Sequence, residues 1–209
     1  MSPTDHVVLI VDDDHTMREA LLNLLAASDL HGMAFGSASE YIAHPKTDVA
    51  TCLILDVELP DINGLDLQRQ IGNGYHPPII FLTGRGDIPS SVRAIKAGAL
   101  DFLTKPFDAE QLLRLVHTAF ALDRERRRDK SDSERLQRHF ESLTPREREV
   151  LPLVASGLLN KQAAAHLGIS EVTLQTHRTN LMRKMEADSL AELVRMAASL
   201  GIPVTRTRH

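Results

Sequence analysis

The sequence is poor in aromatic residues and in cysteine. It has no tryptophan, six phenylalanines, two tyrosines and a single cysteine, Cys52. One cysteine cannot form an internal disulfide, which excludes the small disulfide-stabilised secreted folds. Since such a chain needs no oxidising compartment, we expect a cytoplasmic location.

Long hydrophobic runs are also missing. Apolar runs such as residues 52–55 and 77–82 have the length of a strand, whereas a helix that crosses a bilayer needs about 20 residues. Residues 1–6 lack the basic start and apolar centre of a secretory signal. We therefore expect no membrane segment and no membrane partner.

The remaining composition is that of a globular protein with two unlike halves. Hydrophobic residues make up 43% and charged residues 25% of the 209 residues, which excludes a wholly disordered or collagen-like chain. Residues 1–122 hold 16 acidic and 8 basic residues, whereas residues 123–209 hold 12 acidic and 16 basic ones. This asymmetry indicates different partners for the two halves, and only the second is compatible with nucleic acid.

Strand-like and helix-like segments alternate in the first half. Continuous apolar runs at 7–11, 52–55 and 79–82 are typical of strands buried on both faces. A shorter version lies at 100–103, where Asp101 interrupts it, and a weaker one at 33–35. Helical patterns separate them; one contains Val92, Ile95 and Lys96 and ends at Gly98, and the last begins after Asp108. The alternation predicts an α/β, doubly wound, five-stranded parallel sheet over residues 1–122.

The second half is predicted to be helical. Residues 123–130 contain no apolar residue, proline or glycine, so we interpret residues 123–142 as a helical linker with a solvated charged surface. Four helix starts follow, and they predict an all-α domain over residues 143–209. The residues expected to start or cap these helices are Thr144, Asn160, Ser170 and Ser189.

Polar residues follow four of the predicted strands. Asp12 to Asp14 follow the first, Asp56 the third, Thr83 the fourth and Lys105 the fifth. These groups should meet at the carboxyl edge of the sheet. Converging carboxylates need a cation, and oxygen ligands suit Mg²⁺. With Asp56 as nucleophile, Lys105 as ammonium and Thr83 as hydroxyl, the set fits phosphoryl transfer, whereas Asp14 alone is better explained as a helix cap.

The motifs around these residues resemble the receiver domain of two-component response regulators. They are VDDD at 11–14, LDVELPDING at 55–64, TG at 83–84 and KAGALDFLTKPF at 96–107. The resemblance implies a flavodoxin-like fold whose Asp56 is phosphorylated by a sensor histidine kinase. It further implies a contact of Lys105 with the phosphoryl group and an inward movement of Thr83 and Phe102 as a switch, although Phe102 could equally be an ordinary core residue. The implied Mg²⁺ ligands are Asp13, Asp56, the backbone carbonyl of Glu58 and, through water, Asp12.

Two further residues are expected beside the acidic site at the carboxyl edge of the sheet. Glu58 and Arg85 lie two residues after Asp56 and Thr83. One hypothesis is that they pair and screen the phosphoryl group from water. The alternative is two independent solvated side chains, since exposed pairs contribute only about 0–1 kcal/mol.

Residues 161–185 predict a helix-turn-helix. Helices at 161–167 and 171–185 flank the turn Gly168-Ile169-Ser170, and the second helix would enter the major groove of double-stranded DNA. Leu174, Leu181 and Met185 should face the core. The residues expected to contact bases or phosphates are Lys161, Gln175, Thr176, Arg178, Thr179, Arg183 and Lys184.

This half resembles the LuxR-type DNA-binding domain, and its tail resembles the FixJ branch. The motifs are LTPREREVL at 143–151, GLLNKQAA at 157–164, LGIS at 167–170 and TLQTHRTNLMRKM at 173–185. Many members carry Val-Lys where this chain has Leu174-Gln175, which removes one expected DNA contact. We interpret His177 as a structural residue.

Together these features predict a FixJ-like response regulator. Phosphorylation of Asp56 would favour a homodimer that binds DNA and, with RNA polymerase, activates transcription; the chain would not be an enzyme beyond its own phosphorylation and dephosphorylation. One alternative is a Mg²⁺-dependent phosphatase or phosphotransferase that uses Asp56 on small substrates. Another is a regulator that works without phosphorylation and keeps a vestigial acidic site.

Overall fold

The computed structural model describes residues 5–72, 76–84 and 95–203. The chain divides into two compact units, Met1–Arg127 and Arg128–His209. The division falls inside the segment expected to be the linker. Each unit is described by itself.

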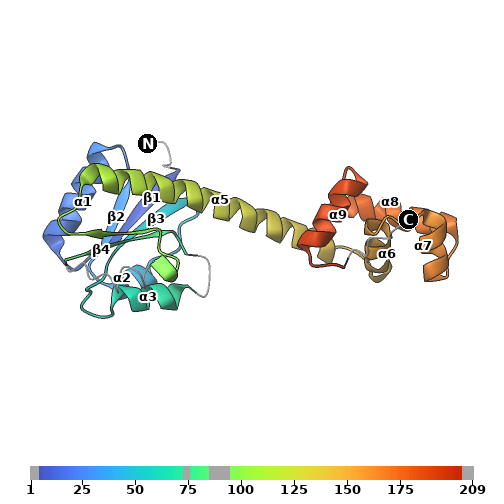
Figure 1. The fold of residues 1–209 in the computed structure, drawn as a ribbon, viewed down its shortest axis with the longest axis horizontal. Helices are drawn as coiled ribbons and strands as arrows, with labels where there is room; N and C mark the ends of the chain where they lie inside the picture. Colours follow the sequence, from blue (N-terminus) through green and yellow to red (C-terminus); the bar gives the residue numbers. More distant parts are fainter. Residues whose placement is uncertain (1–4, 73–75, 85–94, 204–209) are drawn as a thin grey trace. The chain divides into compact units, whose positions relative to one another are not determined.

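The first unit contains the predicted parallel sheet. Its five strands are ordered β2-β1-β3-β4-β5, and every neighbouring pair is parallel (Figure 1). The strands are β1 (His6–Val11), β2 (Gly32–Phe35), β3 (Ala50–Asp56), β4 (Ile79–Thr83) and β5 (Asp101–Thr104). The doubly wound α/β prediction is confirmed, including the weak strand around 33–35.

Helices cover both faces of this sheet (Figure 1). They are α1 (His15–Ala27), α2 (Ala38–Ala43), α3 (Gly64–Ile71) and the first part of α5 (Ala109–Glu141). Val8 and Ile10 of β1 pack with α1 and α5, whereas Val7 and Leu9 pack with α2 and α3. This two-sided burial explains why the strands are continuously apolar.

Two predicted helices have different outcomes. Asp108 caps the start of α5, accepting from the backbone N–H groups of Glu110 at 3.2 Å and Gln111 at 3.3 Å. The predicted helix near Val92 lies partly outside the described residues; Ile95 and Lys96 are helical, and Gly98 follows with φ 92°.

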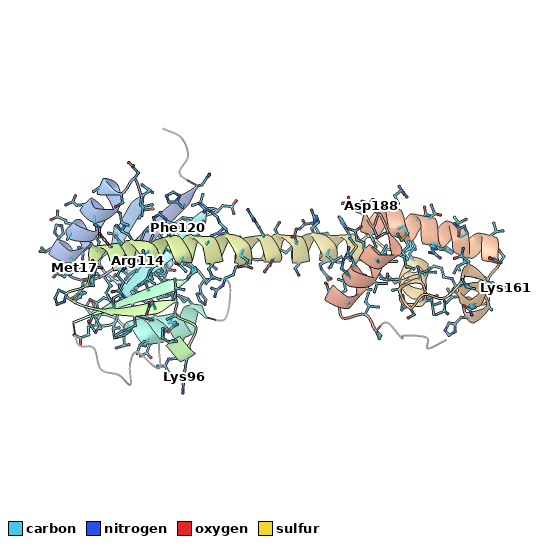
Figure 2. The ribbon with its side chains drawn as sticks, turned by 45° about the horizontal axis from the view of Figure 1, so that its top comes forward. Met17, Lys96, Arg114, Phe120, Lys161 and Asp188 are labelled. Atoms are coloured by element: carbon cyan, nitrogen blue, oxygen red, sulfur yellow. The ribbon has the colours of Figure 1, made fainter. Side chains whose placement is uncertain are left out.

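The expected linker is helical, as predicted, and belongs to α5. This helix runs for 33 residues without a break, so the charged stretch continues the last helix of the sheet unit. Phe120, labelled in Figure 2, lies near the end of its apolar part. One charged side chain in the stretch, Asp123, is fully buried, although the sequence suggested a solvated surface throughout.

The second unit is the predicted four-helix domain. Its helices are α6 (Pro145–Ala155), α7 (Asn160–Leu167), α8 (Glu171–Met185) and α9 (Leu190–Ser199). Leu174, Leu181 and Met185 of α8 are fully buried in one hydrophobic cluster, as expected. The prediction that Asn160 caps α7 is wrong by one residue: the cap is Leu159, whose backbone N–H donates to Gln162 Oε1 at 2.9 Å, and Asn160 is the first helical residue.

No helix in the described part of the chain is both long enough and apolar enough to span a bilayer.

Candidate metal and DNA-binding sites

The carboxyl edge of the sheet gathers the residues that the sequence singled out. Asp12 directly follows β1, and Asp56 and Thr83 end β3 and β4. Asp56 is in register with Leu82, and Thr83 with Thr104. The Lys105 backbone N–H donates to the Thr83 carbonyl at 2.7 Å, which brings the lysine to the same edge. The parallel register therefore places all four residues together.

Lys105 lies at the centre of this group. Its Nζ is 2.6 Å from Asp12 Oδ2 and 2.6 Å from Asp56 Oδ2. The side chains of Asp12 and Asp56 are only 2% and 8% exposed. A buried carboxylate is stable only with a charged or hydrogen-bonding partner, so the ammonium group allows two acidic groups to be buried side by side.

Burial and pairing shift the pKa values in this group. Burial raises the pKa of Asp12, with a smaller raising effect from Asp56, and the hydrogen bond from Lys105 only partly opposes this. For Lys105, burial acts to lower the pKa, but the hydrogen bonds to Asp12 and Asp56 outweigh burial and raise it. Lys105 is therefore charged near neutral pH.

A third carboxylate completes a possible metal site. Oxygen atoms of Asp12, Asp13 and Asp56 all lie within 4.8 Å of one another, and Asp13 is exposed to solvent. The Glu58 backbone N–H donates to Asp56 Oδ1 at 3.0 Å, so the loop that carries the Glu58 carbonyl is tied to the Asp56 side chain. Three carboxylates against one lysine leave excess negative charge, and an all-oxygen donor set fits a hard divalent cation.

Two residues that the sequence analysis did not single out shape this site. Arg18 of α1 donates from Nη1 to the carbonyls of Asp12 at 2.7 Å and Asp13 at 2.9 Å, and so fixes the acidic loop. Gly64 lies so close to β3 that an added Cβ would be 2.3 Å from the Asp56 carbonyl oxygen. Gly64 ends the motif at 55–64, but the motif does not indicate how closely Gly64 approaches β3, and nothing in the local pattern around Arg18 indicates its two acceptors.

The loop after β3 has a further anchor. Asp61 accepts from the backbone N–H of Ser39 at 2.9 Å and from its hydroxyl at 2.8 Å, at the start of α2. These hydrogen bonds lower the pKa of Asp61. The loop that carries Glu58 is thus attached to α2 as well as to Asp56.

The remaining residues predicted for this site differ in their exposure to solvent. Thr83 is buried, and Phe102 is half-buried with its ring centroid 6.5 Å from that of Phe81. Asp14 caps α1, accepting from Thr16 and Met17 backbone N–H groups, as expected of it alone. Glu58 is exposed, and Arg85 lies outside the described residues, so the hypothesis of their pairing stays a prediction.

The predicted DNA contacts lie on α7 and α8. Figure 2 labels Lys161 on α7. Arg178 is half-buried, and His177 is also half-buried. The exposed members of the set are Lys161, Gln175, Thr176, Thr179 and Arg183.

Lys184 differs from the rest of this set. Its Nζ lies 2.8 Å from Glu147 Oε2 and 3.3 Å from the Ser142 carbonyl. Glu147 is buried and also accepts from the Thr144 backbone N–H at 2.8 Å. The lysine charge is therefore already paired inside the domain, a placement that does not support the predicted phosphate contact.

Comparison with known proteins agrees with both halves of this description. Residues 8–117 match the family model described as response regulator receiver domain. Residues 141–197 match that of bacterial regulatory proteins, luxR family.

Similar proteins match over nearly the whole chain. The chain is 48% identical to Nodulation protein W of Bradyrhizobium diazoefficiens, over 99% of this chain and 91% of that protein. It is 38% identical to Transcriptional regulatory protein FixJ of Azorhizobium caulinodans, over 96% and 95%. The solved structure of response regulator StyR matches with a TM-score of 0.83 and 43% identity, over 92% of this chain and 98% of that one. The chain therefore belongs to the FixJ-like response regulators, transcriptional regulators in which a LuxR-type DNA-binding domain follows a receiver domain.

Proposed function

We propose that Asp56 accepts a phosphoryl group from a sensor histidine kinase and that phosphorylation controls DNA binding by the second unit. The observation that carries this proposal is the position of Lys105 Nζ, 2.6 Å from both Asp12 and Asp56. A carboxylate oxygen of Asp56 would attack the phosphorus of the phosphohistidine, and the phosphorus–nitrogen bond would break. Lys105 is placed to hold a phosphoryl oxygen afterwards.

We propose Mg²⁺ as the cation of this site. Asp13 and Asp56 would hold it directly with the carbonyl of Glu58, and Asp12 would act through water. When bound, Mg²⁺ neutralises charge on the phosphoryl oxygens. The all-oxygen donor set and the excess of carboxylates over ammonium groups support this choice.

The output would follow from a shift between two states of the receiver. Thr83 would move toward the phosphoryl group and Phe102 would turn inward, and both belong to strands that pair with each other. A modification changes such an equilibrium only through its preference for one state. The favoured state would form a homodimer, place two α8 helices on a two-fold site in double-stranded DNA, and activate transcription with RNA polymerase.

We propose that this phosphoryl chemistry is confined to Asp56, so the chain is not an enzyme for other substrates. We also propose a location in the bacterial cytoplasm, which a DNA target supports. Sustained release of phosphate from a small phosphate ester would instead support the alternative of a phosphatase or phosphotransferase.

The test uses the full chain with Mg²⁺, with and without acetyl phosphate, beside Asp56→Asn. Sedimentation measures the oligomeric state, and pull-down of genomic DNA fragments measures selection. We expect the wild type to dimerise and select DNA only with the donor, and the variant to do neither. Identical behaviour of both proteins with and without donor would show that the receiver is not the switch, as in the alternative with a vestigial acidic site.

A further inference from the structure

Asn160 connects α7 to two residues of the recognition helix α8. Its Nδ2 donates to Gln175 Oε1, and Arg178 Nη1 donates to its Oδ1 at 2.8 Å. Asn160 and Arg178 are half-buried, whereas Gln175 is exposed. The three side chains therefore form a short chain of hydrogen bonds that ends on the face expected to meet DNA.

The chemistry of Arg178 determines which atoms donate and which accept in these hydrogen bonds. A guanidinium group carries donors and no acceptor, so the Asn160 atom that faces it must be the carbonyl oxygen. The NH₂ group of Asn160 then faces Gln175, which must offer its own carbonyl oxygen. The orientation of both amides thus follows from the donor-only character of arginine, although amide orientation is otherwise hard to assign.

We propose that Asn160 is a specificity-determining residue that presents Gln175 to DNA as a hydrogen-bond donor; this inference rests on the proposed DNA binding. With Oε1 turned toward α7, the two N–H groups of Nε2 remain for a base edge. A free glutamine prefers adenine, because it can offer a donor and an acceptor together. A glutamine held by Asn160 should instead prefer the acceptors of guanine (O6, N7) or thymine (O4).

The neighbouring threonines are consistent with this division of roles. Thr176 Oγ1 donates to the Val172 carbonyl at 3.1 Å, and Thr179 Oγ1 donates to the Gln175 carbonyl at 3.0 Å. Their hydroxyl protons are used within α8, so in this arrangement they face outward with methyl groups and lone pairs. Of Gln175, Thr176 and Thr179, the amide of Gln175 is thus the group left to donate outward.

The decisive variant is Asn160→Asp. A carboxylate still accepts from Arg178, but its second oxygen can only accept as well. The Gln175 amide would then rotate, donate from Nε2 to the carboxylate and expose Oε1. This reversal should change the preferred base from one with acceptors to one with a donor, adenine (N6) or cytosine (N4).

The experiment selects binding sites from a randomised duplex library with the full chain, Mg²⁺ and acetyl phosphate. Affinities are then measured on duplexes that differ at one base pair. We expect the wild type to prefer guanine or thymine at one position by roughly five- to tenfold. Asn160→Asp should reverse this preference at the same position, Asn160→Ala should shift it toward adenine, and Gln175→Ala should abolish it.

Lys161→Ala is the matched control on α7, because loss of an exposed cation should weaken all duplexes alike and leave the preference unchanged. Thermal unfolding of each variant verifies that the domain is folded. If Asn160→Asp does not fold, the base preference of Asn160→Ala provides the test. An unchanged preference in the folded Asn160 variants, or in Gln175→Ala, would overturn the inference while DNA binding stands. A wild type that selects no duplex would overturn the proposed function itself.

Discussion

Asp123 of α5 accepts a hydrogen bond from the backbone N–H of Thr51 at 2.9 Å across 72 residues of sequence. The carboxylate is fully buried and also pairs with Arg127, one turn further along α5, at 2.8 Å. Arg127 in turn donates to the Thr47 carbonyl at 3.1 Å. The long helix is thereby fastened to the start of β3 just before the first unit ends at Arg127.

Replacement of Asp123 by Ala should destabilise the first unit. The buried Thr51 N–H would lose its partner, and an unsatisfied buried group costs about 1–3 kcal/mol. Urea unfolding of the full chain, followed by circular dichroism, measures the change. Asp129→Ala is the control, because Asp129 is exposed on the same helix and surface changes usually stay within about 0.5 kcal/mol. Equal effects of the two variants would show that the Thr51 contact contributes nothing.

Mg²⁺ should raise the thermal stability of the wild type. A ligand that binds only the folded state stabilises it by about 2.7 kcal/mol at 100 times its Kd. Asp13→Asn should lose this effect because it removes a carboxylate from the cluster. Asp14→Asn should keep it, since Asp14 caps α1 and asparagine is also a good cap. The melting temperature is measured with Mg²⁺ and with chelator, and an undiminished Mg²⁺ effect in Asp13→Asn would contradict the assignment.

Gly64→Ala should disturb both the fold and the position of Asp56. The new Cβ would lie 2.3 Å from the Asp56 carbonyl oxygen, so the backbone must move. Such overpacking typically costs about 1–3 kcal/mol, and the displaced loop should slow labelling of Asp56 by acetyl phosphate. Gly36→Ala is the control, because its Cβ would meet its nearest atoms at an ordinary 3.6 Å. Normal stability and labelling of Gly64→Ala would refute the argument.

Glu147→Gln should change the acid stability of the second unit. Burial acts to raise the pKa of Glu147, but hydrogen bonds from Lys184 and Thr144 outweigh it and lower the pKa. A lowered folded pKa gives stability that is complete above the unfolded value, about 4.3 for glutamate, and that is lost as the pH falls through the folded pKa. The variant should therefore be less stable than wild type at pH 7, with a difference that shrinks as the pH falls below that unfolded value.

Chemical unfolding of the full chain between pH 7 and pH 3 measures this difference. Glu149→Gln is the matched control, since Glu149 is exposed on the same helix and pairs with Arg146 one turn away. If the difference in unfolding free energy between the wild type and Glu147→Gln stays constant with pH, the ionised pair is not its cause.

The sequence by itself determined the class of both domains and most of the acidic site. Continuous apolar runs require strands buried on both faces, and parallel strands bring their carboxyl ends to one edge. Asp12, Asp56, Thr83 and Lys105 could therefore be placed together from strand ends alone. The helix starts at Thr144, Ser170 and Ser189 were equally local, because capping needs only a side chain and the next turn.

Only the tertiary structure decided which groups use their charge or hydrogen bonds inside the protein. Asp123 and Lys184 belong to charged stretches that local pattern assigns to solvent or to DNA, yet each has a partner far away in the sequence. Asn160 seemed a helix cap, but the approach of α8 makes it a bridge between Gln175 and Arg178. Local periodicity determines which face of a helix is apolar, whereas the partner of a polar side chain depends on how distant segments pack together.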